Sequence, residues 1–251
     1  MKYAILALEE TVLQNLRKKE KIMANKKMVI GGSSLTASQM KDFFRQVEEG
    51  SVTSCMFQAF LERRNPFEKT GDVLGEWREF YRKYFGIELG DIKIPEKTPE
   101  QGEFSRLIIV AKDLTNNQVY NTCTKHFPCW RHTDNLDKDV PTNERDPKNG
   151  SYAIWVRDVV EADEVHKRKS AEMIKKENLT TETLLERMLH ELKHFSETGK
   201  HLDISNWTLC SGSRFRGGSV PSAGWDGSRF EVGWNYAGNR DENLRSREVI
   251  S

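Results

Sequence analysis

Hydrophobic side chains recur every three or four residues in several stretches of the chain, which is the spacing of one face of a helix. The first stripe consists of Met40, Phe43, Phe44 and Val47. An aromatic stripe follows, made of Trp77, Phe80, Tyr81, Tyr84 and Phe85. The clearest pattern spans 184–195, and it begins after a Thr183/Glu186 pair with the spacing of a capping box. We therefore expect helices near 38–49, 73–85 and 184–195.

The N-terminal part of the chain shows helical patterns only. A further apolar stripe at 56–61 ends before Asn65-Pro66, because the residue before a proline resists helical geometry. A polar stretch with Pro66 and Gly71 follows. We predict a helical N-terminal region over 1–66 and a second domain over 67–251.

Strand patterns begin in the second domain. Leu107–Ala111 and Tyr152–Val156 are continuous apolar runs, typical of buried strands, with a helix through Val119 and Cys123 between them. After Gly199 the chain reads as short strands and turns, with strands expected at 207–210, 229–235 and 244–250. The predicted fold class is α+β, with a helical N-terminal region followed by a mixed domain of short antiparallel strands.

The stretch 229–235 alternates between two kinds of residue. Phe230, Val232 and Trp234 are expected to share a buried face, and Arg229, Glu231 and Asn235 an outward face. Asp226-Gly227, just before it, is a hairpin signal. The sequence thus predicts a small sheet anchored by tryptophans, with loops that display polar and aromatic residues.

Composition narrows the possible partners. The 251 residues carry a formal net charge of +1, which favours neither nucleic acid nor an anionic membrane surface. No apolar run reaches membrane length, and the first residues do not have the pattern of a signal peptide, so we expect a cytoplasmic protein. Four scattered cysteines imply no disulfide framework.

Two patterns suggest metal chemistry. His190-Glu191-Leu192-Lys193-His194 matches the H-E-x-x-H helix of zinc hydrolases, in which two histidines bind zinc and the glutamate is the general base. The helical periodicity, however, predicts that both histidines face water, opposite the buried stripe. Cys123-x-x-His126-x-x-Cys129-x-x-His132 has four ligand types, but not at the spacing of common zinc fingers. We predict no metal, no cofactor and no enzymatic activity.

The residue types of the C-terminal segment are unusual. Within 213–243 only four residues belong to the set Trp, Lys, Met, Gln and Glu, and these are Trp225, Glu231, Trp234 and Glu242. The segment resembles the variable region of variable proteins of diversity-generating retroelements. In that family, reverse transcription randomises adenines, and the affected Asn codons cannot yield those five residue types. Gly217-Gly218-Ser219-Val220 stands where the family has Gly-Gly-Ser-Trp.

The resemblance implies a C-type-lectin-like domain that displays a diversified ligand-binding surface, with an unknown protein or small ligand as partner. Loop residues and the outward face of 229–235 are the expected ligand-facing positions, because they carry little packing. They are Phe215, Ser219, Ser222, Asp226, Arg229, Glu231, Asn235, Tyr236 and Asn239. The alternatives are a zinc hydrolase using the 190–194 helix and a nucleic-acid-associated adaptor using the N-terminal helices.

Overall fold

The computed structural model describes residues 37–49, 52, 60–61 and 72–251, and the chain divides into two compact units, 1–69 and 70–251. In the first unit, helix α2 (Ala37–Glu48) is the helix predicted at 38–49. Most of the expected second helix at 56–61, and the expected domain boundary at residue 66, lie outside the described residues.

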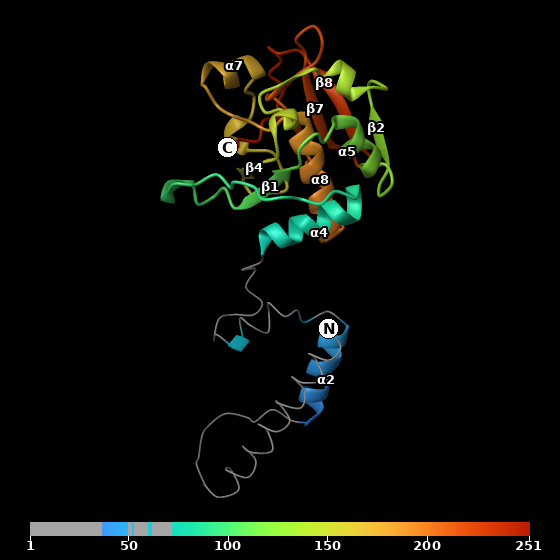
Figure 1. The fold of residues 1–251 in the computed structure, drawn as a ribbon. Helices are drawn as coiled ribbons and strands as arrows, with labels where there is room; N and C mark the ends of the chain where they lie inside the picture. The colour runs from blue at the N-terminus through green and yellow to red at the C-terminus, as the bar shows by residue number, and fades with distance from the viewer. Residues whose placement is uncertain (1–36, 50–51, 53–59, 62–71) are drawn as a thin grey trace, which may run out of the picture. The chain divides into compact units, whose positions relative to one another are not determined.

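The second unit opens with helix α4 (Val73–Phe85), which coincides with the predicted aromatic stripe (Figure 1). The Asp72 carboxylate accepts a hydrogen bond from the backbone N–H of Gly75 and so caps the helix. At the other end Gly86 takes the left-handed conformation that closes many helices. The Tyr81 hydroxyl donates to the Ile109 carbonyl at 2.7 Å, which fixes α4 to the following strand.

Strands β1 (Arg106–Val110) and β4 (Tyr152–Val156) form an antiparallel pair. Helix α5 (Asn116–Cys123) lies between them in sequence. Helix α8 (Leu184–Thr198) packs against β1, α5 and the C-terminal sheet, and it occupies the centre of the unit (Figure 1). The hydrogen bonds of the Thr183/Glu186 capping box form as the spacing predicts.

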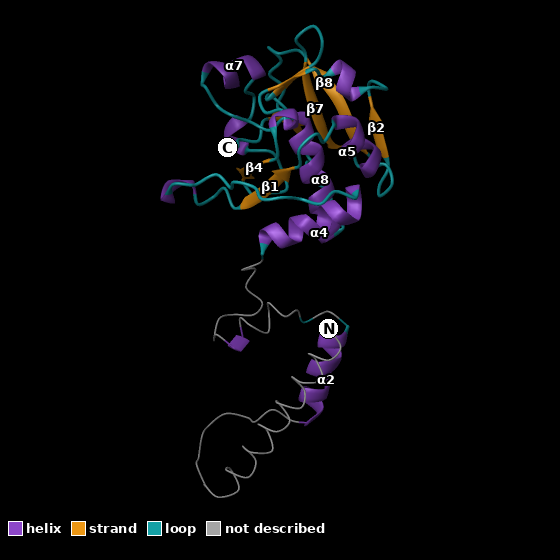
Figure 2. Cartoon of the chain, in the orientation of Figure 1, coloured by secondary structure: helices purple, strands orange, loops and turns teal. Residues whose placement is uncertain are grey.

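Four C-terminal strands and β2 form a five-stranded sheet in the order β2-β8-β7-β5-β9. Figure 2 labels three of these strands, β2, β8 and β7. Its strands are β2 (Cys129–Arg131), β5 (Trp207–Leu209), β7 (Val220–Trp225), β8 (Phe230–Asn235) and β9 (Leu244–Arg245). β7 and β8 form an antiparallel hairpin, whereas β2 runs parallel to β8 and β9 parallel to β5. The remaining elements are α6 (Leu136–Asp139), β3 (Thr142–Asn143), α7 (Ala171–Lys176), β6 (Ser213–Arg214) and 3-10 turns at 99–101, 147–149 and 164–166.

The predicted fold class is confirmed, because helices precede a sheet-rich C-terminal region of short strands. The closing strand expected at 244–250 is shorter than predicted. After β9 the chain makes only single bridges, one from Glu248 to Thr181 and one from Ile250 to Trp155. The tail therefore crosses from the large sheet to the β1–β4 pair and ties the two together.

The expectation that His190 and His194 face water is wrong for His190, whereas His194 is partly exposed. Every residue of α8 from Leu184 to Lys193 is buried, and His190 is only 1% exposed. The helix has neighbours on several sides, since β1, α5 and β7 all pack against it. A single apolar stripe in the sequence does not reveal that the opposite face is buried among charged partners.

Candidate functional site

The outward face of the five-stranded sheet is hollowed into a shallow groove of about 330 Å³. Strands β5, β7 and β8 and the segment before β9 form its walls. Its lining residues are Trp207, Ser222, Glu231, Gly233, Trp234, Asn235, Asp241, Asn243 and Leu244. This volume is at the lower end of small-ligand pockets, which begin near about 300 Å³.

The register of β7 and β8 explains the groove. Ala223 lies opposite Val232, and both are fully buried in the core. The neighbouring pairs, Ser222 with Gly233 and Gly224 with Glu231, must point to the other face because side chains alternate along a strand. Two of those four outward residues are glycines, and one of them, Gly233, exposes bare backbone in the groove.

The indole of Trp207 closes one side. It lies over Gly224, where an added Cβ would be 3.1 Å from a ring carbon. The other part of this sheet face is covered, because Leu209 and Val220 form a small buried cluster with Ala171 of α7. The open area of the face is therefore confined to the groove and its rim.

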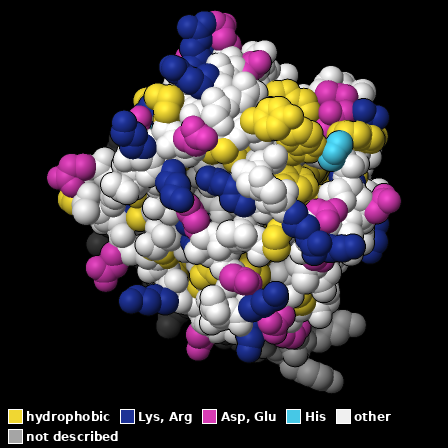
Figure 3. Space-filling view, turned by 90° about the horizontal axis from the view of Figure 1, so that it is seen from above, with side chains coloured by type: hydrophobic (Ala, Val, Ile, Leu, Met, Phe, Trp, Pro, Cys, Tyr) yellow, Lys and Arg dark blue, Asp and Glu magenta, His cyan; other side chains and the backbone are white. Residues whose placement is uncertain are grey.

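A row of aromatic rings lies next to the groove. Trp130 contacts His132, His132 contacts Trp234 and Trp234 contacts Tyr236, with centroid distances of 6.3, 5.8 and 5.2 Å. Trp130 is 39% exposed and Tyr236 71%. Figure 3 shows hydrophobic side chains gathered beside a histidine on the face it displays. Exposed aromatic groups of this kind are enriched at recognition surfaces.

The prediction that Trp234 is buried with Phe230 and Val232 is wrong. Phe230 and Val232 are fully buried, but Trp234 is 36% exposed. Strand β2 pairs with β8 only as far as Val232, so nothing from β2 extends the core under Trp234. The indole packs on the ring of His132 instead.

The predicted ligand-facing residues fall into three groups. Ser222, Glu231 and Asn235 line the groove, although Ser222 lies in a strand, is only 4% exposed and accepts a hydrogen bond from Asn235 Nδ2. Tyr236 and Asn239 are exposed beside it, and Asn239 Nδ2 donates to Asn235 Oδ1. The structure brings these five predicted residues together.

The other four predicted residues lie apart from the groove lining. Asp226 and Arg229 belong to the β7–β8 turn, where backbone N–H groups of Ser228 and Arg229 lower the pKa of Asp226 to about 2. Arg229 donates to Glu231 Oε1. Phe215 was predicted to face a ligand, but it is partly buried and packs against the main core. The Ser219 carbonyl accepts a hydrogen bond from the Phe215 N–H.

Sequence reasoning missed several residues of this surface. Trp130 and His132 are distant in sequence, and only the parallel pairing of β2 with β8 brings them here. Trp207 was expected only as one of the tryptophans that anchor the sheet. Asp241 and Asn243 carried no pattern, although their place shortly before a strand that borders β5 could have suggested them.

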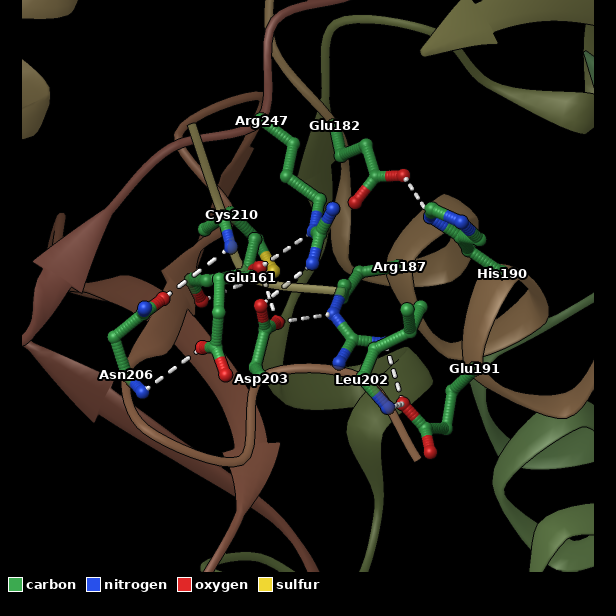
Figure 4. A network of polar contacts seen from close by, with 12 residues as sticks. Glu161, Glu182, Arg187, His190, Glu191, Leu202, Asp203, Asn206, Cys210 and Arg247 are labelled. Atoms are coloured by element: carbon green, nitrogen blue, oxygen red, sulfur yellow. Dashed lines mark hydrogen bonds and ion pairs between the residues drawn. The ribbon is translucent and has the colours of Figure 1, made fainter. Parts of the chain in front are cut away.

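A buried ionic cluster lies inside the unit (Figure 4). The Asp203 carboxylate accepts from Arg187 Nε at 2.9 Å and from Arg247 Nη2 at 2.6 Å, and all three side chains are at most 1% exposed. Burial raises the pKa of Asp203, but the two guanidinium groups and the Thr208 hydroxyl outweigh it and lower the pKa below its ordinary value. The cluster joins α8, the loop before β5 and the C-terminal tail.

Glu191 and His201 extend this cluster. Glu191 accepts from Arg187 Nη1, from the Leu202 N–H and from His201 Nδ1. The ring of His201 in turn stacks on Trp225 at the end of β7, with centroids 3.5 Å apart and planes 8° apart. A continuous set of contacts therefore runs from α8 to the hairpin that carries the groove.

A second buried pair lies on the same helix. His190 Nδ1 is 2.9 Å from Glu182 Oε1, and both side chains are buried. Burial lowers the pKa of His190 well below its ordinary value and raises the pKa of Glu182 to about 8, although Arg247 and Arg187 oppose the latter. Both groups are therefore expected to be neutral at pH 7.

The two metal patterns do not form a cluster. Among the described residues, no group of three or more His, Cys, Asp or Glu side chains is placed to hold a metal ion. In the first pattern, Glu191 is bound by Arg187 and His201, and His190 by Glu182. In the second, Cys123 is buried inside the core while His132 lies at the exposed aromatic row.

Comparisons with known proteins return no relatives: no family model, no curated protein and no solved structure matches this chain. Within the described part of the chain, no helix combines the length and the apolar character needed to cross a membrane.

Proposed function

We propose that this protein is a ligand-binding display protein, and that its binding surface is the outward face of β7 and β8 with its neighbouring loop. The observation that carries the proposal is the separation of roles within β8. Phe230 and Val232 are fully buried, while Glu231 and Asn235 line an open groove. Side chains on the open register can change without disturbing the core, which a display protein requires.

The buried cluster of Arg187, Asp203 and Arg247 supports this proposal. Binding surfaces work best when the elements beneath them are held in one geometry. Asp203 connects to the hairpin through its carbonyl, which accepts from the Trp225 N–H at 3.0 Å. The groove therefore rests on a frame whose parts are linked by ionic hydrogen bonds inside the unit.

The residue types on the surface support a diversified display region. Ser222, Asn235, Tyr236, Asp241 and Asn243 are all types that randomised adenine codons of the retroelement family can yield. Glu231 and Trp234 are not, and in this proposal they are constant parts of the surface. The proposed class is thus a variable protein of a diversity-generating retroelement with a C-type-lectin-like domain, and its partner is a protein or a small ligand.

No specific observation favours the two alternative functions. A zinc hydrolase would need Glu191 as a free base, but its carboxylate accepts hydrogen bonds from Arg187, His201 and the Leu202 N–H. A nucleic-acid adaptor would use the N-terminal unit, where the described stretch 37–49 holds two basic and three acidic side chains. Arg45 there is paired with Asp42 and Glu49.

The proposal is tested in the DNA around the coding sequence. We expect a second, near-identical copy of the segment that encodes 213–243, differing mainly where the copy has adenines, and a reverse transcriptase gene nearby. Finding neither would contradict the diversification mechanism. A binding role without diversification is tested separately, by randomising outward and loop positions and selecting for binding.

A further inference from the structure

The groove has a distinct chemical character. Its charged lining residues, Glu231 and Asp241, are both acidic, and none of the described lysines or arginines lines it. Within the described part of the chain, Asp241 has no ion-pair partner, and its Oδ1 accepts only from the Asn243 N–H. Glu231 is bound by Arg229 through Oε1, and its carboxyl group also contacts that of Asp226. Asp241 Oδ2 is thus not occupied by a donor from the described residues.

Tryptophan residues line the same groove as these carboxylates. One side of the Trp207 indole lies on Gly224, and the residue is partly exposed and lines the groove. Trp234 is also a lining residue of the groove, at the end of β8. Carboxylates beside an indole face are the combination that binds organic cations, because the ring quadrupole and the negative charge both attract a positive group.

The same surface already holds one such arrangement within the chain. The Arg229 guanidinium lies 5.4 Å from the ring centroid of Trp130 and pairs with Glu231 at 2.5 Å. It shows how a planar guanidinium can satisfy a carboxylate and an indole at once. The groove also contains a carboxylate and an indole, those of Asp241 and Trp207. No guanidinium from the described part of the chain pairs with this carboxylate.

We infer that the groove binds an arginine side chain presented by a peptide segment of a protein partner. The guanidinium would lie between the Trp207 indole and the carboxylates of Asp241 and Glu231, over the bare backbone of Gly233. The volume of about 330 Å³ suits one long side chain and is small for a folded element. This inference rests on the proposed function, since it names the ligand chemistry of the same surface.

The experiment uses the full chain and the peptide acetyl-Gly-Arg-Gly-amide, titrated by calorimetry. Its control peptide has citrulline in place of arginine, which keeps the shape and removes the charge. We expect the arginine peptide to bind at least about tenfold more tightly than the citrulline peptide, and to weaken as salt is added. Equal affinity for both, or no binding of the arginine peptide, would overturn the inference.

Two variants locate the site. Asp241→Asn keeps the acceptor for the Asn243 N–H and should raise the dissociation constant about threefold or more. Asp134→Asn, which removes the same charge from an exposed position outside the groove lining, should leave it unchanged. Gly233→Leu should abolish binding, since it fills the floor of the groove. If a thermal melt shows that Gly233→Leu does not fold, Gly233→Ala is used in its place. A Cβ at Gly233 would lie 3.7 Å from Ser222 Oγ, which is an ordinary contact.

Equal effects of Asp241→Asn and Asp134→Asn, or full binding by a folded Gly233→Leu, would place the arginine elsewhere and contradict the inference. The proposed function fails differently. A surface that binds selected ligands but not the arginine peptide contradicts only the ligand chemistry, whereas a surface that cannot be varied without unfolding contradicts the display role itself.

Discussion

The Trp207 indole lies against Gly224 of the neighbouring strand, and a Cβ at Gly224 would be 3.1 Å from the ring and 3.2 Å from the Asn206 carbonyl oxygen. Gly224→Ala should therefore lower the free energy of unfolding by about 1–3 kcal/mol, as overpacking does. Gly233→Ala is the matched control, because its Cβ meets only Ser222 Oγ at 3.7 Å, and its effect should stay within about 0.5 kcal/mol. Urea denaturation measures both, and equal losses would contradict the close packing of Trp207.

The Asp203 carboxylate is the shared partner of two buried guanidinium groups. Asp203→Ala leaves Arg187 and Arg247 buried beside each other without it, which should cost about 3–5 kcal/mol of stability. Asp134→Asn, an exposed aspartate, should change stability by less than about 0.5 kcal/mol. Denaturant melts of the two variants test this, and an Asp203→Ala protein that melts like the parent would show that the cluster does not hold the frame together.

The buried Glu182–His190 pair predicts a pH dependence. The pKa of Glu182 is raised from 4.5 to about 8, so the folded state holds its proton more tightly and stability from this group is lost as pH rises towards 8. The pKa of His190 is lowered, so its contribution is instead lost as pH falls below about 6.5. Between pH 6.5 and 8 the loss from Glu182 should therefore dominate within the pair.

Glu182→Gln removes that titration while keeping a neutral side chain of the same shape. Its free energy of unfolding should fall less between pH 6.5 and 8 than that of the parent. Denaturant melts at several pH values give both slopes. Parallel slopes for the two proteins would mean that Glu182 is ionised in the folded state at neutral pH.

The exposure of Trp234 changes the energetic expectation for β8. Phe230→Ala removes a fully buried ring and should cost about 3–5 kcal/mol. Trp234→Ala should cost distinctly less, because the residue is 36% exposed and its neighbours His132 and Tyr236 are exposed too. Thermal and urea melts compare the two variants. A similar loss of unfolding free energy in both would mean that Trp234 packs in the core as Phe230 does.

Local patterns were enough to predict the elements whose partners lie close in sequence. The aromatic stripe at 73–85, the apolar runs of β1 and β4 and the Thr183/Glu186 capping box each correspond to what the structure shows. These signals depend on periodicity and on backbone hydrogen bonds within one element, so they survive in a single sequence.

Features set by distant partners could not be predicted in the same way. His190 was predicted to face water because its partner Glu182 is an ionisable side chain, and periodicity counts only apolar neighbours. Trp234 read as buried because alternation continues past the point where β2 stops. Predicting the groove would have required the strand register that places Gly224 and Gly233 on one face of the sheet. That register depends on tertiary structure.

The most direct test of the display surface is a paired library experiment on the full chain. One library randomises five outward or loop positions, Asn235, Tyr236, Asn239, Asp241 and Asn243, and the other randomises five buried positions, Leu209, Val220, Ala223, Phe230 and Val232. Resistance to a protease, read by sequencing, measures which variants fold. We predict that most of the first library stays resistant and yields binders to an unrelated protein target, while most of the second is cleaved. Comparable cleavage of both libraries, or a resistant first library from which no target selects a binder, would contradict the account.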